Sequence, residues 1–127
     1  MPIYGVAQAG SNPTAGLNLS VVQPGDSYVL FNGEVITPPQ ASVAFVRGNS
    51  ISESDQGMTF QMSFATAPTA VLVIQGSNVD LDAAYETLWT STNTQYDNYT
   101  DTTRWTYYRA KLVSQSAGGA VTVRVQR

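Results

Sequence analysis

The chain has 127 residues, which suits a single domain and is long enough to bury a core without disulfides or structural metals. Charged residues make up only 12% of it, and the formal net charge of -3 has the wrong sign for a nucleic-acid-binding protein. Cysteine and histidine are absent, which excludes thiolate chemistry, histidine general bases and metal sites built on either residue. We therefore expect a protein that is not an enzyme and carries no cofactor. No apolar run approaches the ~18 residues that cross a bilayer and no signal-peptide pattern opens the chain, so neither a membrane nor export is expected.

Residues 1–16 combine prolines and glycines with small polar residues and show no hydrophobic periodicity. This composition predicts an extended N-terminal arm that precedes a domain over residues 17–127. The sizeable apolar side chains of the arm are Ile3, Tyr4 and Val6. Because the arm has little apolar surface to offset its ordering entropy, we expect these three to anchor it on a neighbouring subunit or surface.

The first part of the predicted domain shows strand and turn signals. Apolar and polar residues alternate over 17–22, which predicts a half-buried strand. Asn32-Gly33 lies between the apolar segments 28–31 and 35–36, and this pattern predicts a two-residue hairpin. A weaker strand is expected at residues 44–46.

The middle of the chain carries the clearest strand signals. Met58, Phe60, Met62 and Phe64 alternate with polar residues, as in an antiparallel strand that covers a core with one face. Residues 70–75 are apolar on both faces, which predicts a central strand. A short helix over residues 81–88, capped by Asp80, is weighed against a loop. The polar stretch 93–103 is interpreted as a long exposed loop.

Two strands are expected at the end of the chain, over residues 104–113 and 120–125. Gly118-Gly119 separates them, so they are predicted to form a hairpin. Seven or eight strands at spacings of roughly 8 to 12 residues predict an all-β fold, a single antiparallel β-sandwich or a small barrel. The alternating positions of the apolar strands supply the predicted core: Phe60, Met62, Phe64, Leu72, Ile74, Leu112, Val123 and Val125.

A candidate interface lies on the strand predicted over residues 104–113. Trp105, Tyr107, Arg109 and Lys111 share one face of it, and the opposite face is assigned to the core. Two aromatic and two cationic side chains together are typical of interface hot spots, and Trp105 or Tyr107 can also stack on a sugar. The alternative is that Trp105 lies partly under the loop of 93–103 while the cations face water.

Acidic residues provide two further hypotheses. Asp80, Asp82 and Glu86 offer oxygen ligands for calcium, but no glycine lies between them to fold a tight loop, and a solvated acidic loop is the favoured interpretation. Asp97 and Asp101 suggest a carboxylate pair for glycoside hydrolysis, although two acids in a polar loop are more typical of a surface. We predict neither a metal site nor a catalytic residue.

Residues 69–126 contain an ordered set of strand motifs. VIQGSN (73–78) ends an apolar strand, WTST (89–92) follows, and YYRAKL (107–112) precedes the Gly-Gly link. This order resembles small β-sandwich structural proteins of tailed bacteriophages and, more distantly, discoidin-like jelly-roll domains.

The resemblance implies a virion component made in the host cytoplasm. The expected function is that of a capsid decoration (cement) protein on the capsid surface. It is expected to be a homo-oligomer, a trimer, docked on the major capsid protein or neighbouring virion subunits. The alternative is a carbohydrate- or receptor-binding module of a phage tail or fibre. Neither nucleic acid nor a membrane is an expected partner.

Overall fold

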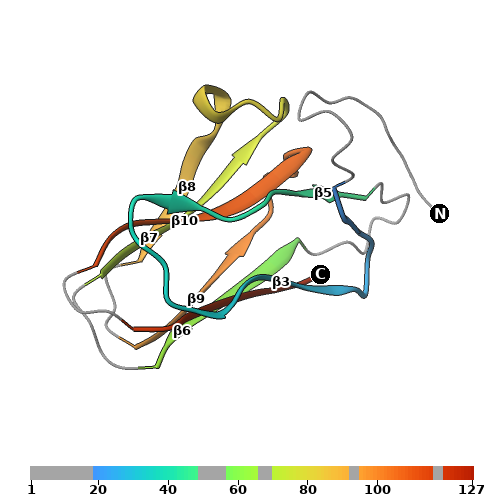
Figure 1. Cartoon of the computed structure of the whole chain (residues 1–127). Helices are drawn as coiled ribbons and strands as arrows, with labels where there is room; N and C mark the ends of the chain where they lie inside the picture. The colour runs from blue at the N-terminus through green and yellow to red at the C-terminus, as the bar shows by residue number, and fades with distance from the viewer. Residues whose placement is uncertain (1–18, 49–56, 66–69, 92–94, 116–118) are drawn as a thin grey trace.

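Two β-sheets packed face to face form the protein, as Figure 1 shows for the layer with β5, β10, β7 and β8 above the layer with β3, β6 and β9. The computed structural model describes residues 19–48, 57–65, 70–91, 95–115 and 119–127. The predicted all-β sandwich is therefore confirmed. The described elements, in chain order, are β2 (Val21–Val22), β3 (Ser27–Glu34), β4 (Gln40–Ala41), β5 (Phe45–Arg47), β6 (Met58–Phe64), β7 (Ala70–Ser77), the 3-10 helix η2 (Asp82–Ala84), β8 (Glu86–Ser91), β9 (Tyr96–Asp101), β10 (Tyr107–Gln115) and β11 (Val121–Gln126).

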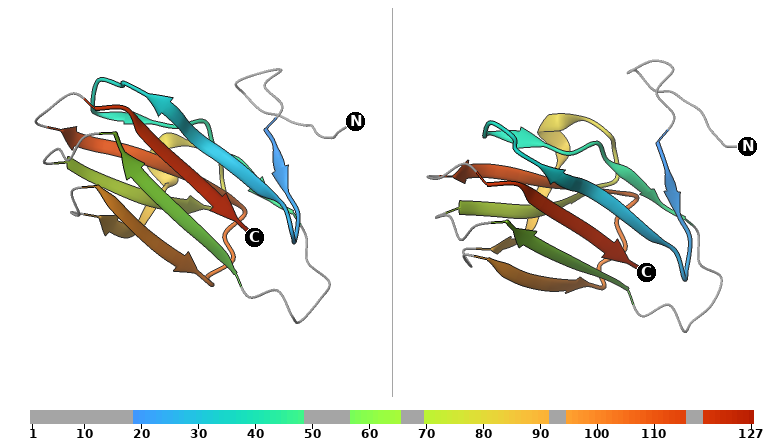
Figure 2. Two further views of the ribbon diagram at one scale, coloured as in Figure 1. Left: turned by 90° about the horizontal axis from the view of Figure 1, so that it is seen from below. Right: turned by 60° about the horizontal axis from the view of Figure 1, so that its bottom comes forward.

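The larger sheet has the strand order β2-β5-β10-β7-β8, with β4 also paired to β10, and the smaller sheet has the order β3-β11-β6-β9. Strands pair antiparallel throughout, apart from β2 and β5, which run parallel. The two further views in Figure 2 show the sheets stacked with their strands running in similar directions. This arrangement is the aligned packing expected when two twisted sheets share one core.

The core lies between the sheets and is built from the alternating positions that the sequence predicts. Met58, Phe60, Met62 and Phe64 are all buried, while Gln61 between them is exposed. The eight predicted core residues are confirmed as buried. Aromatic contacts cross the interior. The centre of the Tyr108 ring lies 5.7 Å from that of the Phe45 ring and 5.8 Å from that of the Phe60 ring. Both sheets therefore depend on one shared apolar cluster.

The predicted hairpin at Asn32-Gly33 is wrong, because β3 runs straight through both residues. In the pairing of β3 with β11, Val121 faces Glu34 and the adjacent Thr122 faces Asn32, which leaves Gly33 as an extra residue in a β-bulge. Gly33 has a φ of 64°, a left-handed conformation that glycine adopts readily. The Asn-Gly pair thus indicates a left-handed backbone, which serves a bulge as well as a turn.

The exposed loop predicted over residues 93–103 is also wrong. Tyr96–Asp101 form β9, an edge strand that pairs antiparallel with β6. The strand is polar on both faces because its inward residues, Tyr99 and Asp101, are satisfied by hydrogen bonds within the protein. The side chains of β9 alternate between inward and outward, but the sequence did not indicate a strand because both sets are polar.

The last two strands do not form the predicted hairpin. β10 lies in the larger sheet and β11 in the smaller one, so the chain changes sheets between Gln115 and Val121. Leu112 of β10 and Val123 of β11 belong to the same core but come from opposite sheets. Two strands of one hairpin would lie side by side in a single sheet. The short helix weighed for residues 81–88 is reduced to η2, followed at once by β8.

Candidate binding surface

The strand face predicted as an interface is not a free surface. β10 begins at Tyr107, so Trp105 lies before the strand and its indole packs against the core cluster. A Cβ atom placed on Gly76 would lie 2.7 Å from Cγ of Trp105, which shows how closely the indole covers that glycine. Trp105 is therefore half-buried, which is closer to the partly buried alternative than to a fully exposed side chain, and the missing side chain at Gly76 leaves room for the indole.

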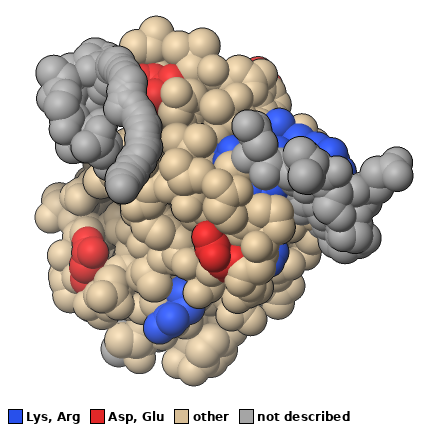
Figure 3. All heavy atoms as spheres, turned by 90° about the vertical axis from the view of Figure 1, so that its right-hand side faces the viewer, with Lys and Arg blue, Asp and Glu red and all other residues tan. Residues whose placement is uncertain are grey.

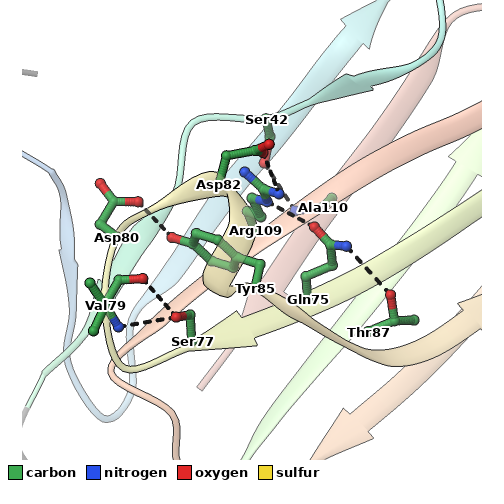
Figure 4. Close-up of polar contacts among 10 residues, drawn as sticks. All are labelled: Ser42, Gln75, Ser77, Val79, Asp80, Asp82, Tyr85, Thr87, Arg109 and Ala110. Atoms are coloured by element: carbon green, nitrogen blue, oxygen red, sulfur yellow. Dashed lines mark hydrogen bonds and ion pairs between the residues drawn. The ribbon is translucent and has the colours of Figure 1, made fainter.

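Arg109 is only 8% exposed, although it was predicted to lie free on the outer face of β10. Its Nε donates a hydrogen bond of 2.8 Å to the side-chain oxygen of Gln75, its partner residue on β7. The guanidinium also forms an ion pair of 2.8 Å with Asp82 and lies 4.0 Å above the centre of the Tyr85 ring. Figure 4 shows Asp82 and Tyr85, from the β7–β8 connection, folded over the guanidinium. Arg109 thus clamps this connection onto the sheet and is not available to a partner.

The acidic residues considered for calcium have separate partners. Asp80 accepts a hydrogen bond of 2.7 Å from the Tyr85 hydroxyl, whereas Asp82 pairs with Arg109. Burial raises the pKa of Tyr85 above its ordinary value, and the hydrogen bond to Asp80 raises it further. Glu86 is exposed. Across the described ranges, no group of three or more acidic side chains is arranged to hold a metal ion.

The other predicted interface residues have different positions. Tyr107 and Lys111 lie on the outer side of the larger sheet and are half-buried. Ile3, Tyr4 and Val6 lie outside the described residues.

Asp101 is a buried carboxylate that joins the two sheets, with 1% of its surface exposed. The hydroxyl of Tyr108 on β10 donates to it at 2.6 Å, that of Tyr99 at 2.7 Å, and Thr103 donates through both its hydroxyl and its backbone N–H. Burial raises the pKa of both tyrosines above the ordinary value, and hydrogen bonding to Asp101 adds to the effect. These donors compensate the buried charge.

Asp97 accepts a hydrogen bond of 2.8 Å from the Ser91 hydroxyl on β8 and forms a second link between the sheets. Asp97 and Asp101 therefore bind different partners within the protein. Their role in the described structure is to hold the edges of the sandwich together.

A groove of about 530 Å³ lies on the outer face of the smaller sheet, across β9, β6 and β11. The strand register places its outward side chains in two adjacent rows. The first row is Asn98, Gln61 and Arg124, and the second is Tyr96, Ser63 and Thr122. Met62 and Asp97 also border the groove, but the first side chain is buried in the core and the second is bound to Ser91.

Three polar side chains of the groove have no side-chain partner among the described residues. Gln61, Asn98 and Arg124 form no side-chain hydrogen bond or ion pair with any residue of the described structure. The Tyr96 ring projects from the same surface and is 68% exposed. A rigid sheet therefore presents two amides, a guanidinium, two hydroxyls and an aromatic ring to solvent.

The surroundings of the groove are weakly charged. Arg124 is its single outward-facing ionic side chain among the described residues, since the carboxylate of Asp97 turns inward. The face of the molecule in Figure 3 is likewise mostly uncharged, apart from isolated acidic groups and basic groups gathered mainly at one side. The sequence interpretation missed this surface because it assigned Tyr96 and Asn98 to a loop. The alternation of Tyr96, Asn98 and Thr100 is the signal that could have found it.

Comparisons with known proteins identify no family. No protein-family model matches the chain, and no curated protein matches it. Among solved structures, the chain is similar to the SPBc2 prophage-derived protein YomS, with 14% sequence identity and a TM-score of 0.47 over 79% of this chain and 90% of that chain. No helix among the described residues is long and apolar enough to cross a membrane.

Proposed function

We propose that the protein is a non-enzymatic structural component of a tailed-bacteriophage virion, a capsid decoration protein that docks on the major capsid protein or on neighbouring virion subunits. The strand motifs of residues 69–126 support this proposal through their resemblance to phage β-sandwich proteins. In the structure, the two main motifs lie on β7 and β10, which pair with each other along nearly their whole length. The motifs thus belong to the centre of the larger sheet.

The observation that carries the docking proposal is the position of β2. Among the described strands, β2 lies at the end of the larger sheet and pairs with β5 alone, through Val21 with Val46 and Val22 with Arg47. The described part of the chain therefore begins at an edge of this sheet, and the shared core is built almost wholly from later strands. An arm that precedes β2 can bind a partner without rearrangement of either sheet.

In this proposal Ile3, Tyr4 and Val6 are the anchors. A neighbouring subunit supplies the apolar surface that offsets the ordering entropy of residues 1–16, about 1 to 2 kcal/mol per residue for the backbone. The docked protein is a homo-oligomer, a trimer, on the capsid surface. Light scattering of the purified protein tests the trimer directly.

Deletion of residues 2–12 tests the docking arm. We expect the melting temperature of the sandwich to stay unchanged and binding to capsids that lack the protein to be lost. The triple variant Ile3→Ser, Tyr4→Ser and Val6→Ser should reproduce the loss, whereas the control Gln8→Ser should bind normally. A fall of many degrees in the melting temperature would mean that the arm is part of the sandwich. Full capsid binding by the deletion variant would also overturn the proposal.

The second candidate, a carbohydrate- or receptor-binding module, is favoured by a different observation. The outer groove of the smaller sheet offers polar side chains that have no partner among the described residues, beside an exposed tyrosine, whereas β2 belongs to the larger sheet. The two candidates use different surfaces, so one protein can carry both activities.

A further inference from the structure

We infer that the groove across β9, β6 and β11 is a binding site for a neutral oligosaccharide, with the Tyr96 ring as its stacking platform. We refer to this surface as the Tyr96 groove and define it by Tyr96, Asn98, Gln61, Ser63, Thr122 and Arg124. The inference rests on the second candidate function and deepens it, because it assigns one ligand class to a surface that the docking arm does not include.

Hydrogen-bonding capacity is the first argument. A sugar presents neighbouring hydroxyls that both donate and accept, so its binding site needs donors and acceptors side by side. The amides of Gln61 and Asn98 each offer both, and the guanidinium of Arg124 offers only donors. Cross-strand pairing of Gln61 with both of the others aligns the three in one row. None of these side chains is engaged elsewhere in the described structure, so binding breaks no internal bond.

Tyr96 is the second argument. Its ring is 68% exposed on an edge strand, where burial against the protein does not explain an aromatic residue. An aromatic ring beside polar groups suits a ligand with one apolar and one polar side, and a sugar ring has such sides in its C–H face and its hydroxyls. Tyr96 pairs across the strands with Ser63, so the platform adjoins the hydrogen-bonding rows.

Size and boundaries agree with a short stretch of glycan. Strands lie about 4.8 Å apart, so three of them span about 10 Å, and successive outward residues lie about 6.7 Å apart along a strand. This area fits about one to two sugar rings. Beyond the first row, the hydroxyls of Thr59 and Thr100 bond to each other at 3.0 Å. The free polar groups therefore end there.

Charge argues against other ligand classes. Nucleic acids and acidic polysaccharides are bound through several cations, but Arg124 is the one cation of the Tyr96 groove and the whole chain has a net charge of -3. A protein partner generally requires a fully buried apolar centre. The outward side chains of this groove include one large ring, Tyr96, surrounded by amides and hydroxyls.

The test is binding of the full chain to an array of immobilised neutral oligosaccharides that contain hexoses and N-acetylhexosamines, with heparin and single-stranded DNA as polyanion controls. We expect binding to neutral glycans that is at least about tenfold weaker for Tyr96→Ala and for the double variant Gln61→Ala, Asn98→Ala. Tyr96→Phe keeps the ring and should retain binding within a few fold. The matched control is Leu81→Ala, which removes a large apolar side chain that is 57% exposed on the β7–β8 connection, outside the Tyr96 groove, and should leave glycan binding unchanged.

Three outcomes would overturn the inference: no binding to any neutral glycan, stronger binding to the polyanions, or glycan binding that Tyr96→Ala leaves unchanged. Capsid binding separates this inference from the docking proposal. The Tyr96 groove variants should still bind capsids, and the arm deletion should still bind glycans. Loss of capsid binding in the Tyr96 groove variants would assign this surface to a protein partner instead.

Discussion

The outer faces of the two sheets differ in whether their arginine side chain is buried or exposed. On the larger sheet, Arg109 is covered by Tyr85 and Asp82 and bonded to Gln75. On the smaller sheet, Arg124 faces solvent without a partner among the described residues. Position on an outward strand face therefore does not decide whether a side chain can meet a ligand. What decides it is whether a connection elsewhere in the chain folds over that face.

The largest expected effect concerns the core that both faces share. Phe64 lies on β6, the strand that carries Gln61 and Ser63 of the Tyr96 groove, but its side chain points into the core. Phe64→Ala should lower the free energy of unfolding by roughly 3 to 5 kcal/mol, because it removes buried apolar area and leaves a cavity. Thermal and denaturant unfolding measure the loss.

The exposed control for this change is Val35→Ala, at a position that is 73% exposed, where the stability should stay within about 0.5 kcal/mol. A near-neutral Phe64→Ala would contradict the shared core. It would mean that the two sheets do not depend on the same apolar cluster and that their faces cannot be compared as parts of one unit.

The next prediction compares the two arginines directly. Arg109→Ala should cost roughly 2 to 3 kcal/mol, because the buried oxygen of Gln75 loses its donor and the Tyr85 ring loses its cation. The ion pair with Asp82 adds little, since the Asp82 side chain is 84% exposed. Arg124→Ala should change the free energy of unfolding by no more than about 0.5 kcal/mol. Equal effects of the two substitutions would remove the distinction between a clamped face and a free one.

Arg109→Lys tests whether the positive charge alone accounts for the effect of Arg109 on stability. A lysine ammonium keeps the charge but lacks the planar fork that bonds Gln75 and stacks on Tyr85 together. We therefore expect this variant to lose most of the stability that Arg109→Ala loses. Full stability of Arg109→Lys in denaturant unfolding would show that charge alone holds the connection in place.

The sequence predicted the parts of the fold in which burial determines composition. β6 could be predicted because apolar residues recur at every second position, and β7 because apolar residues occupy both of its faces. β9 was missed because its inward residues are polar, and the side chains that satisfy them, Ser91 and Tyr108, lie on other strands. Local periodicity cannot show a hydrogen bond between distant segments.

The candidate site was harder to predict for a related reason. Alternation correctly placed Arg109 on the outward face of β10, but the cover from Tyr85 depends on the path of the β7–β8 connection. The position of Trp105 depends on Gly76, a glycine of β7 that leaves room for the indole, and alternation along β10 cannot show this. Conversely, Tyr96 became a candidate only when β9 was seen to pair with β6.

The smallest expected effect at neutral pH concerns the tyrosines that hold the clamp and the link between the sheets. Burial, and then hydrogen bonding to a carboxylate, raises the pKa of Tyr85, Tyr99 and Tyr108 above the value of about 10 of an unfolded chain. Below pH 10 these tyrosines are protonated in both states, so the stability they contribute is fully present. As the pH rises above 10, the unfolded chain releases these protons while the folded protein retains them, and stability falls.

Absorbance of the ionised phenol, followed against pH together with circular dichroism, should show late ionisation that coincides with unfolding. Tyr85→Phe removes one of these groups from the clamped face and should make the alkaline loss shallower, because one fewer proton is released on unfolding. An unchanged pH dependence in this variant would contradict the prediction, because it would show that folding does not raise the pKa of Tyr85.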